Sequence, residues 1–128
     1  MEVAVACPNG YRPDEKLMDW ASKNGKFTVT ESVLEASKDA DVLYTDVWAS
    51  MGQESEAEER KRIFKGYQIN AEVMKVAKPD AMVLHCLPAH REEEITAEVF
   101  EQHANEIFDE AENRLHAQKA VLVKCMGE

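Results

Sequence analysis

The sequence predicts an α/β fold in which a parallel, Rossmann-like sheet is flanked by helices. Short apolar runs rich in β-forming residues alternate along the chain with segments of helical spacing, which is the pattern of βαβ units. The length of 128 residues leaves room for one hydrophobic core, so residues 1–128 are expected to form one partial domain. A composition with 45% hydrophobic and 31% charged residues is typical of a soluble globular protein.

The first part of the chain predicts two strands, each followed by a helix. The apolar run at residues 3–7 ends at a Pro-Asn-Gly turn. The next helix begins near Pro13, because proline suits the first helical position, and it extends to about residue 23. Residues 27–30 are the second strand, and the Ser and Glu at positions 32 and 35 have the form of a capping box that starts a short helix.

The middle of the chain predicts two more strands, at residues 41–46 and 81–86, and each is followed by an irregular polar segment. Two helices are expected between them. Residues 54–64 place acids before bases, the order that a helix dipole favours, and residues 70–77 carry apolar side chains at helical spacing up to a proline. The four strands and their connections therefore predict a mostly parallel sheet.

The last part of the chain is expected to be mainly helical. A helix is predicted over residues 96–103, where Thr96 is a suitable cap, followed by a short strand near residues 107–108. A final helix is predicted over residues 110–126, because apolar side chains recur there on one helical face.

Charge and cysteine content exclude several classes of protein. The net charge of −10 disfavours a nucleic-acid partner and an anionic membrane surface. No apolar stretch approaches the roughly 20 residues of a membrane span, and the N-terminus lacks the layout of a signal peptide, so a cytoplasmic location is expected. Cys7, Cys86 and Cys125 are an odd number at wide spacing, which predicts reduced thiols. Neither a cofactor nor a bound metal is expected.

The segment after the third strand carries groups that suit an amino acid ligand. Ligands of open parallel sheets bind beyond the carboxyl ends of the strands. Asp46 can hold an ammonium group, Ser50 can hydrogen-bond a carboxylate, and Gly52 lets the backbone approach a ligand closely. The alternative is that Asp46 and Ser50 only cap the following helix.

The segment after the fourth strand allows three interpretations of Cys86. It could be a small buried apolar residue, a nucleophilic thiolate paired with histidine, or a metal ligand together with His85 and His90. Three ligands within six residues, interrupted by Pro88, fit poorly around one tetrahedral ion. Arg114 either is neutralised by adjacent acids or supplies a fixed cation to an anionic substrate.

Taken together, the order and spacing of these segments resemble the ornithine carbamoyltransferase family over nearly the whole chain. The Asp-x-x-x-Ser-Met-Gly and His-Cys-Leu-Pro motifs are specific in combination, and the cysteine separates this family from aspartate carbamoyltransferases. The segments that carry the resemblance are Pro-Asn-Gly-Tyr-Arg-Pro at 8–13, Asp-Val-Trp-Ala-Ser-Met-Gly at 46–52, His-Cys-Leu-Pro-Ala-His-Arg at 85–91 and Phe-Asp-Glu-Ala-Glu-Asn-Arg at 108–114.

The resemblance implies a role in arginine metabolism: transfer of the carbamoyl group of carbamoyl phosphate to the δ-amino group of L-ornithine, giving citrulline and phosphate. Asp46, Ser50 and the Met51 main chain would hold the α-amino and carboxylate groups of ornithine. The catalytic Cys86 would lie with Leu87 at the δ-amino group and serve as proton acceptor. By the same resemblance, His85 would belong to this δ-amino and carbamoyl-phosphate region, and Arg114 would contact carbamoyl phosphate.

The chain departs from the family in what it lacks. A carbamoyl-phosphate domain with a Ser-Thr-Arg-Thr motif would precede this segment, as would a Gly-Asp-x-x-Asn strand and helix. That strand would lie between the strands at residues 3–7 and 41–45, so its loss leaves two unpaired edges and predicts a homo-oligomer or strand-swapped dimer. Alone, the chain is expected to be inactive; the alternative is a non-catalytic amino-acid-binding or structural module. Glu92 stands where the family usually has glycine.

Overall fold

Short strands alternate with helices along the chain, as the sequence predicts, and the α/β class is confirmed. The computed structural model describes residues 1–49, 52 and 56–127. In chain order the elements are β1 (Glu2–Ala6), α1 (Glu15–Asn24), β2 (Lys26–Thr30), α2 (Val33–Ser37), β3 (Val42–Thr45), α3 (Ala57–Ile63), α4 (Ala71–Val76), β4 (Met82–His85), α5 (Ala97–Gln102) and α6 (Ala104–Met126).

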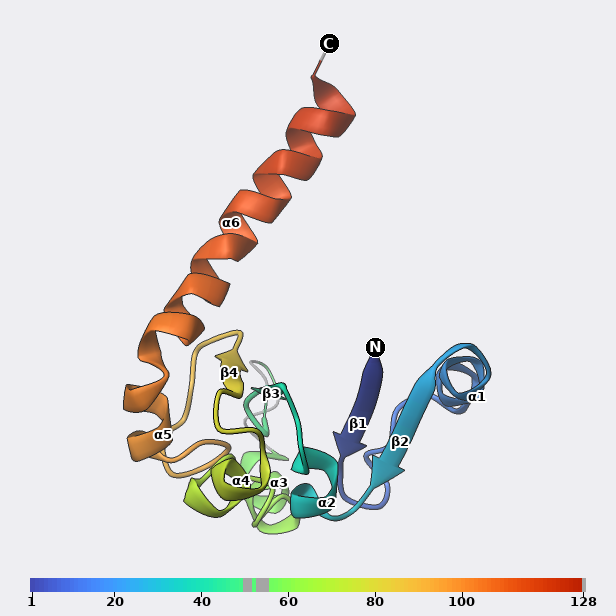
Figure 1. The fold of residues 1–128 in the computed structure, drawn as a ribbon, viewed down its shortest axis with the longest axis vertical. Coiled ribbons are helices and arrows are strands. Elements are labelled where there is room, and N and C mark those ends of the chain that lie inside the picture. The colour runs from blue at the N-terminus through green and yellow to red at the C-terminus, as the bar shows by residue number, and fades with distance from the viewer. Residues whose placement is uncertain (50–51, 53–55, 128) are drawn as a thin grey trace.

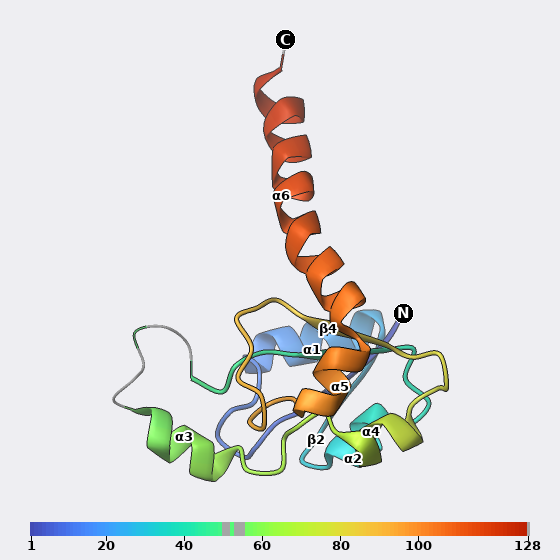
Figure 2. The ribbon, with the colours of Figure 1, turned by 90° about the vertical axis from the view of Figure 1, so that its left-hand side faces the viewer.

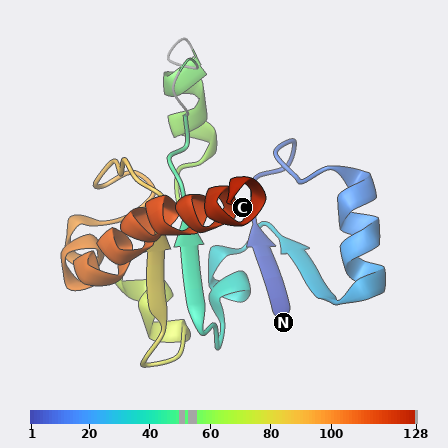
Figure 3. The same ribbon diagram turned by 90° about the horizontal axis from the view of Figure 1, so that it is seen from above.

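The strands pair in parallel, as expected, but they form two separate two-stranded sheets among the described residues. β1 pairs with β2, and β3 pairs with β4. Figure 3 shows the two pairs side by side, with β1 and β3 on the facing inner edges. Each inner strand thus has a ladder partner on one side only, and the predicted single sheet is split where the sequence analysis places a missing strand.

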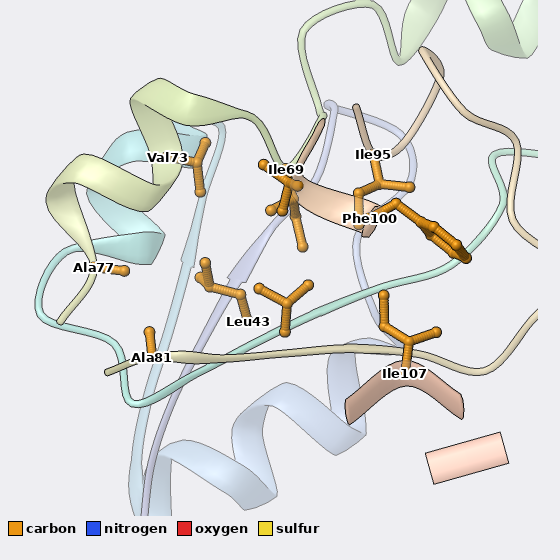
Figure 4. Close-up of a cluster of buried hydrophobic side chains, with 10 residues drawn as sticks. Leu43, Ile69, Val73, Ala77, Ala81, Ile95, Phe100 and Ile107 are labelled. Carbon is orange, nitrogen blue, oxygen red and sulfur yellow. The ribbon is translucent and has the colours of Figure 1, made fainter. Parts of the chain in front are cut away.

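The hydrophobic core lies around β3 and β4. Leu43 and Val83 enter it from the two strands, Val73 from α4, Phe100 from α5 and Ile107 from α6 (Figure 4). Full burial of such a side chain contributes about 1.5–3 kcal/mol to stability. No residue of α1 is buried. The core therefore supports the β3–β4 half of the molecule, which is the half that carries the two polar segments.

Local capping signals in the sequence are confirmed. Ser32 accepts a hydrogen bond from the Glu35 N–H at the start of α2, and Thr96 does the same for Val99 in α5. The Asp14 carboxylate caps α1 directly after the expected helix-starting proline. These side chains satisfy backbone donors that the first turn of a helix leaves unpaired.

The end of the chain differs from the prediction, because α6 is one continuous helix over Ala104–Met126 and there is no strand near residues 107–108. Ile107 is fully buried while Phe108 is 55% exposed. This in-and-out alternation suits a strand, but it suits a helix with one buried face equally well. The first turns of α6 pack near β4, and the rest of the helix projects away from the body (Figures 1 and 2). No helix in the described part of the chain combines the length and apolarity needed to span a membrane.

Candidate functional site

Two neighbouring strand ends bring the predicted acid and thiol together. Thr45 at the end of β3 lies opposite His85 at the end of β4, so Asp46 and Cys86 are the next residues on adjacent strands. A carboxylate oxygen of Asp46, a ring nitrogen of His85 and the Sγ of Cys86 all lie within 4.8 Å of one another. Parallel pairing thus produces the juxtaposition that the sequence analysis expects at the carboxyl edge of a sheet.

A cavity of about 440 Å³ opens beside these groups. That volume falls within the range of about 300–1,000 Å³ that small-molecule sites occupy. Both polar segments contribute to its wall, together with α3 and the loop before α5. The lining residues are Asp46, Val47, Ala49, Ala57, Lys61, Cys86, Leu87, Pro88, His90 and Glu93.

The Asp46 carboxylate accepts a hydrogen bond from the backbone of the next residue, and the side chain is exposed to solvent. The Val47 N–H donates to Asp46 Oδ1 at 2.7 Å. Asp46 does not cap the next described helix, because the N-cap of α3 is Glu56, which makes no side-chain capping bond. This removes the capping alternative for Asp46. Ser50 and Met51, the other predicted ornithine ligands of this segment, lie outside the described residues.

The Cys86 thiol keeps its proton at neutral pH in this environment. Burial raises its pKa above the ordinary value of a thiol, and the hydrogen bond with Asp46 and the charge of that carboxylate raise it further. A hydrogen bond with Tyr44 acts in the opposite direction but does not reverse the shift. Since the nucleophilic form of cysteine is the thiolate, these surroundings disfavour the nucleophile interpretation. The side chain is half-buried and lines the cavity, so it is not a plain core residue either.

His85 is fully buried beside Cys86, and both of its ring nitrogens are engaged. Its Nε2 is 2.9 Å from Glu94 Oε1, and its Nδ1 accepts the Leu87 N–H at 2.9 Å. His85 and Glu94 have no exposed surface. Sequence reasoning did not single out Glu94, because a glutamate in an acidic run is usually solvated.

Metal-ligating atoms gather in two sets, and neither is the set of His85, Cys86 and His90 that the sequence analysis considers and disfavours. Among the described residues, His90 groups with Glu93 and Glu94, whereas His85 and Cys86 group with Asp46. By proximity either set has the ligand types for a divalent cation. In the set of Asp46, His85 and Cys86, however, both His85 nitrogens already have partners. Metal binding there would have to break one of these hydrogen bonds.

Comparison with known proteins identifies the family. Residues 1–125 match the family described as aspartate/ornithine carbamoyltransferase, Asp/Orn binding domain. The chain belongs to this family. It is 56% identical over 131 residues to the anabolic ornithine carbamoyltransferase of Pyrococcus furiosus, covering 98% of this chain and 42% of the relative. It is 55% identical over 127 residues to the ornithine carbamoyltransferase of Methanosarcina acetivorans, with the same coverage of 98% and 42%.

Solved structures of ornithine carbamoyltransferases share the fold. The anabolic enzyme of Campylobacter jejuni superposes with a TM-score of 0.88 at 42% identity, covering 94% of this chain and 42% of that one. The enzyme of Gloeobacter violaceus gives a TM-score of 0.85 at 46% identity, covering 99% and 43%. The chain thus spans well under half the length of these carbamoyltransferases.

Within this Asp/Orn-binding domain, the predicted site residues divide into two groups. Asp46, Cys86 and Leu87 meet at the cavity. Arg114 is exposed on α6, does not line the cavity and forms no ion pair with any residue that the structure describes. The sequence analysis places Lys61 only in the helix expected at residues 54–64, yet Lys61 lines the cavity and pairs with Glu93 at 3.0 Å.

Proposed function

We propose that this chain is the ornithine-binding segment of an ornithine carbamoyltransferase. The observation that supports it best is the shared cavity of Asp46 and Cys86, with their oxygen and sulfur atoms within 4.8 Å. An anionic carboxylate attracts an ammonium group, and a neighbouring thiol can hydrogen-bond an amine. Ornithine carries one amino group at each end, so each interaction has a partner in this ligand.

In the proposed complex, Asp46 holds the α-ammonium group and the Cys86 side of the cavity receives the δ-amine. Ser50 and the Met51 main chain bind the α-carboxylate by the family resemblance. The short distance between the two groups also puts the δ-nitrogen within reach of the carboxylate. A cationic δ-ammonium beside Cys86 would lower the pKa of the thiol, because a nearby positive charge stabilises the thiolate.

The proposed parent reaction follows from a neutral δ-amine. The neighbouring δ-ammonium favours loss of the Cys86 proton to solvent. The thiolate formed in this way then accepts a proton from the δ-ammonium, which leaves a neutral δ-amine. The nitrogen lone pair then attacks the carbonyl carbon of carbamoyl phosphate, and the bond from that carbon to the phosphate oxygen breaks. The attacking nitrogen passes one proton to the leaving phosphate, so that citrulline and phosphate are the products. Carbamoyl phosphate would need the phosphate-binding motif that this sequence lacks. By the family resemblance, this chain would contribute Arg114 and residues 85–87 to that part of the site. We therefore propose that the isolated chain does not turn over, and that no cofactor takes part.

Calorimetry with L-ornithine tests the binding half of the proposal. We expect the chain to bind ornithine and Asp46→Asn to abolish the binding. Asp80→Asn is the matched control, since it removes the same charge at an exposed position near the start of β4, away from the cavity. Binding that survives Asp46→Asn contradicts the role given to Asp46. A wild-type chain that does not bind ornithine contradicts the whole assignment and leaves a purely structural module.

A citrulline assay tests the catalytic half. We expect product only when a carbamoyl-phosphate domain is supplied, and less product when the chain carries Cys86→Ala. Turnover by the chain alone would show that it is complete.

The second candidate is a free-standing amino-acid-binding module without turnover. Asp46, the proposed ornithine ligand, lines the cavity, whereas Arg114, the proposed carbamoyl-phosphate ligand, lies away from it on α6. This arrangement favours ornithine binding without the second substrate. Ornithine binding without citrulline formation, even when the carbamoyl-phosphate domain is present, would support this candidate.

We also propose that the chain self-associates through the inner edges of its two sheets. A second cavity of about 150 Å³ lies between them, lined by Ala4 and Ala6 of β1 and by Leu43 and Thr45 of β3. Parallel strands with unpaired edges recruit further strands, so a second copy that inserts or exchanges a strand would complete both ladders. Sedimentation should show concentration-dependent dimers, whereas a compact monomer at all concentrations would exclude them.

A cytoplasmic location is also proposed. All three cysteines are free, which suits a reducing compartment. Cell fractionation with an antibody to the chain tests this location directly.

A further inference from the structure

One buried carboxylate oxygen closes the loop that carries Cys86. Glu94 Oε1 lies 2.9 Å from His85 Nε2 and accepts the His90 N–H at 2.6 Å. His85 and His90 flank the four residues 86–89. Residues 86–88 line the cavity, and Ala89 packs against the hydrophobic core. A single side chain thus ties together the two ends of the cavity wall.

The hydrogen bonds also fix the tautomer of His85. Because the Leu87 N–H donates to Nδ1, that nitrogen must offer its lone pair, and the ring proton resides on Nε2. The Nε2–H then points to Glu94, whose carboxylate is the acceptor. Burial raises the pKa of Glu94, but the hydrogen bonds from His85 and His90 outweigh it and hold the pKa below its ordinary value. Glu94 is therefore ionised at neutral pH and the pair is a neutral histidine on a carboxylate.

The backbone at Leu87 needs such support. Leu87 has a φ of 55°, in the left-handed region that side chains with a Cβ avoid. Its N–H bond to His85 is what opposes relaxation of this turn. Relaxation would rotate the adjoining peptide groups, including the Leu87 carbonyl, and would shift Cys86 with them.

We propose that Glu94 is a positioning residue for the δ-amine side of the ornithine site, acting through His85 to hold Leu87 and Cys86 toward the cavity. This rests on the proposed function, since it assigns a role within that site. Glu94 itself does not line the cavity. His85 on this view also acts through the turn, because its ring is fully buried.

The test compares Glu94→Ala with the isosteric Glu94→Gln in a chain carrying Cys7→Ala and Cys125→Ser, so that Cys86 is the only thiol. Three quantities are measured: the His85 tautomer by ¹⁵N NMR, the rate of Cys86 alkylation by iodoacetamide, and the affinity for L-ornithine by calorimetry. Glu98→Gln is the matched control, because Glu98 is an exposed glutamate on α5.

We expect the parent chain to show the Nε2–H tautomer. Glu94→Ala should populate both tautomers, change the alkylation rate and weaken ornithine binding about tenfold, the scale of one buried hydrogen-bonded group left without its partner. Glu94→Gln should restore most of each quantity, because the amide oxygen can accept both hydrogen bonds. Loss of fold alone would not give this rescue of tautomer and affinity.

Two results would overturn the positioning role. One is a Glu94→Ala chain that retains the Nε2–H tautomer and the parent affinity. If that variant does not fold, the other is a Glu94→Gln chain that adopts the Nδ1–H tautomer with unchanged affinity and alkylation rate. Absence of ornithine binding in the parent chain would instead defeat the proposed function, and the tautomer and alkylation rate would still decide the role of Glu94.

Discussion

Glu92, in the loop between β4 and α5, combines a strained backbone conformation with a stabilising side-chain hydrogen bond. Glu92 has a φ of 69°, in the left-handed region that glycine adopts without strain, which agrees with the glycine that the sequence analysis expects here from the family resemblance. The left-handed conformation costs a residue with a Cβ about 1 kcal/mol. In compensation, Glu92 Oε1 accepts the Ala97 N–H at 2.8 Å at the start of α5. A capping bond of this kind contributes about 1 kcal/mol.

Two substitutions separate these energies. Glu92→Ala keeps the backbone strain and loses the hydrogen bond, so the free energy of unfolding should fall by about 1 kcal/mol. Glu92→Gly loses the same bond but relieves the strain, so it should be about 1 kcal/mol more stable than the alanine variant and close to the parent chain.

Urea unfolding, followed by circular dichroism, gives these differences from shifts in the midpoint at constant slope. The pair Glu98→Ala and Glu98→Gly is the control, because inside helix α5 the order should reverse and alanine should be the more stable by about 1 kcal/mol. If the glycine variant at position 92 is no more stable than the alanine variant, left-handed strain does not govern this position.

Three further predictions concern the core, the thiol and acid stability. Val83→Ala should lower the free energy of unfolding by about 1–3 kcal/mol, since Val83 is fully buried, whereas Leu122→Ala on exposed α6 should change it by less than about 0.5 kcal/mol; chemical denaturation compares them. Asp46→Asn should lower the pKa of Cys86 and speed its alkylation near pH 8, because the carboxylate is one of the groups that raise that pKa; an unchanged pH profile would contradict the contact. The pKa of Glu94 is lowered in the folded chain, so its ionised carboxylate stabilises the fold at pH values above the ordinary pKa of 4.5. This contribution disappears as the pH falls through the lower pKa of the folded chain. Glu94→Gln should therefore flatten the dependence of stability on pH in that window, as denaturation at a series of acid pH values will show.

The sequence predicted those parts of the fold that depend on neighbouring residues. Ser32 and Thr96 each cap the helix that follows by accepting a hydrogen bond from the N–H three residues ahead, so both signals can be read within one turn. The strand leading to Asp46 and the strand leading to Cys86 were recognisable as apolar runs ending in polar segments. Parallel pairing then places the two groups together, so this part of the site also follows from local pattern and topology.

Features that depend on tertiary contacts could not be predicted in the same way. Ile107 and Phe108 alternate between buried and exposed positions in a manner that a strand and a helix share, and only the packing of α6 near β4 decides between them. Glu94 looked solvated because nothing in its neighbourhood shows that its carboxylate meets a buried histidine nine residues earlier. Arg114 was expected near a helix start and is instead in the middle of α6.

The projecting half of α6 has consequences for cooperativity. Leu115, Leu122 and Met126 are 57–77% exposed, so burial adds little to the order of this segment. Its helical state depends on intrinsic propensity, which is marginal in water for segments shorter than about 12–15 residues. Heating should therefore unwind α6 gradually from its C-terminal end, while the side chains around Val83 melt in one sharp transition at higher temperature.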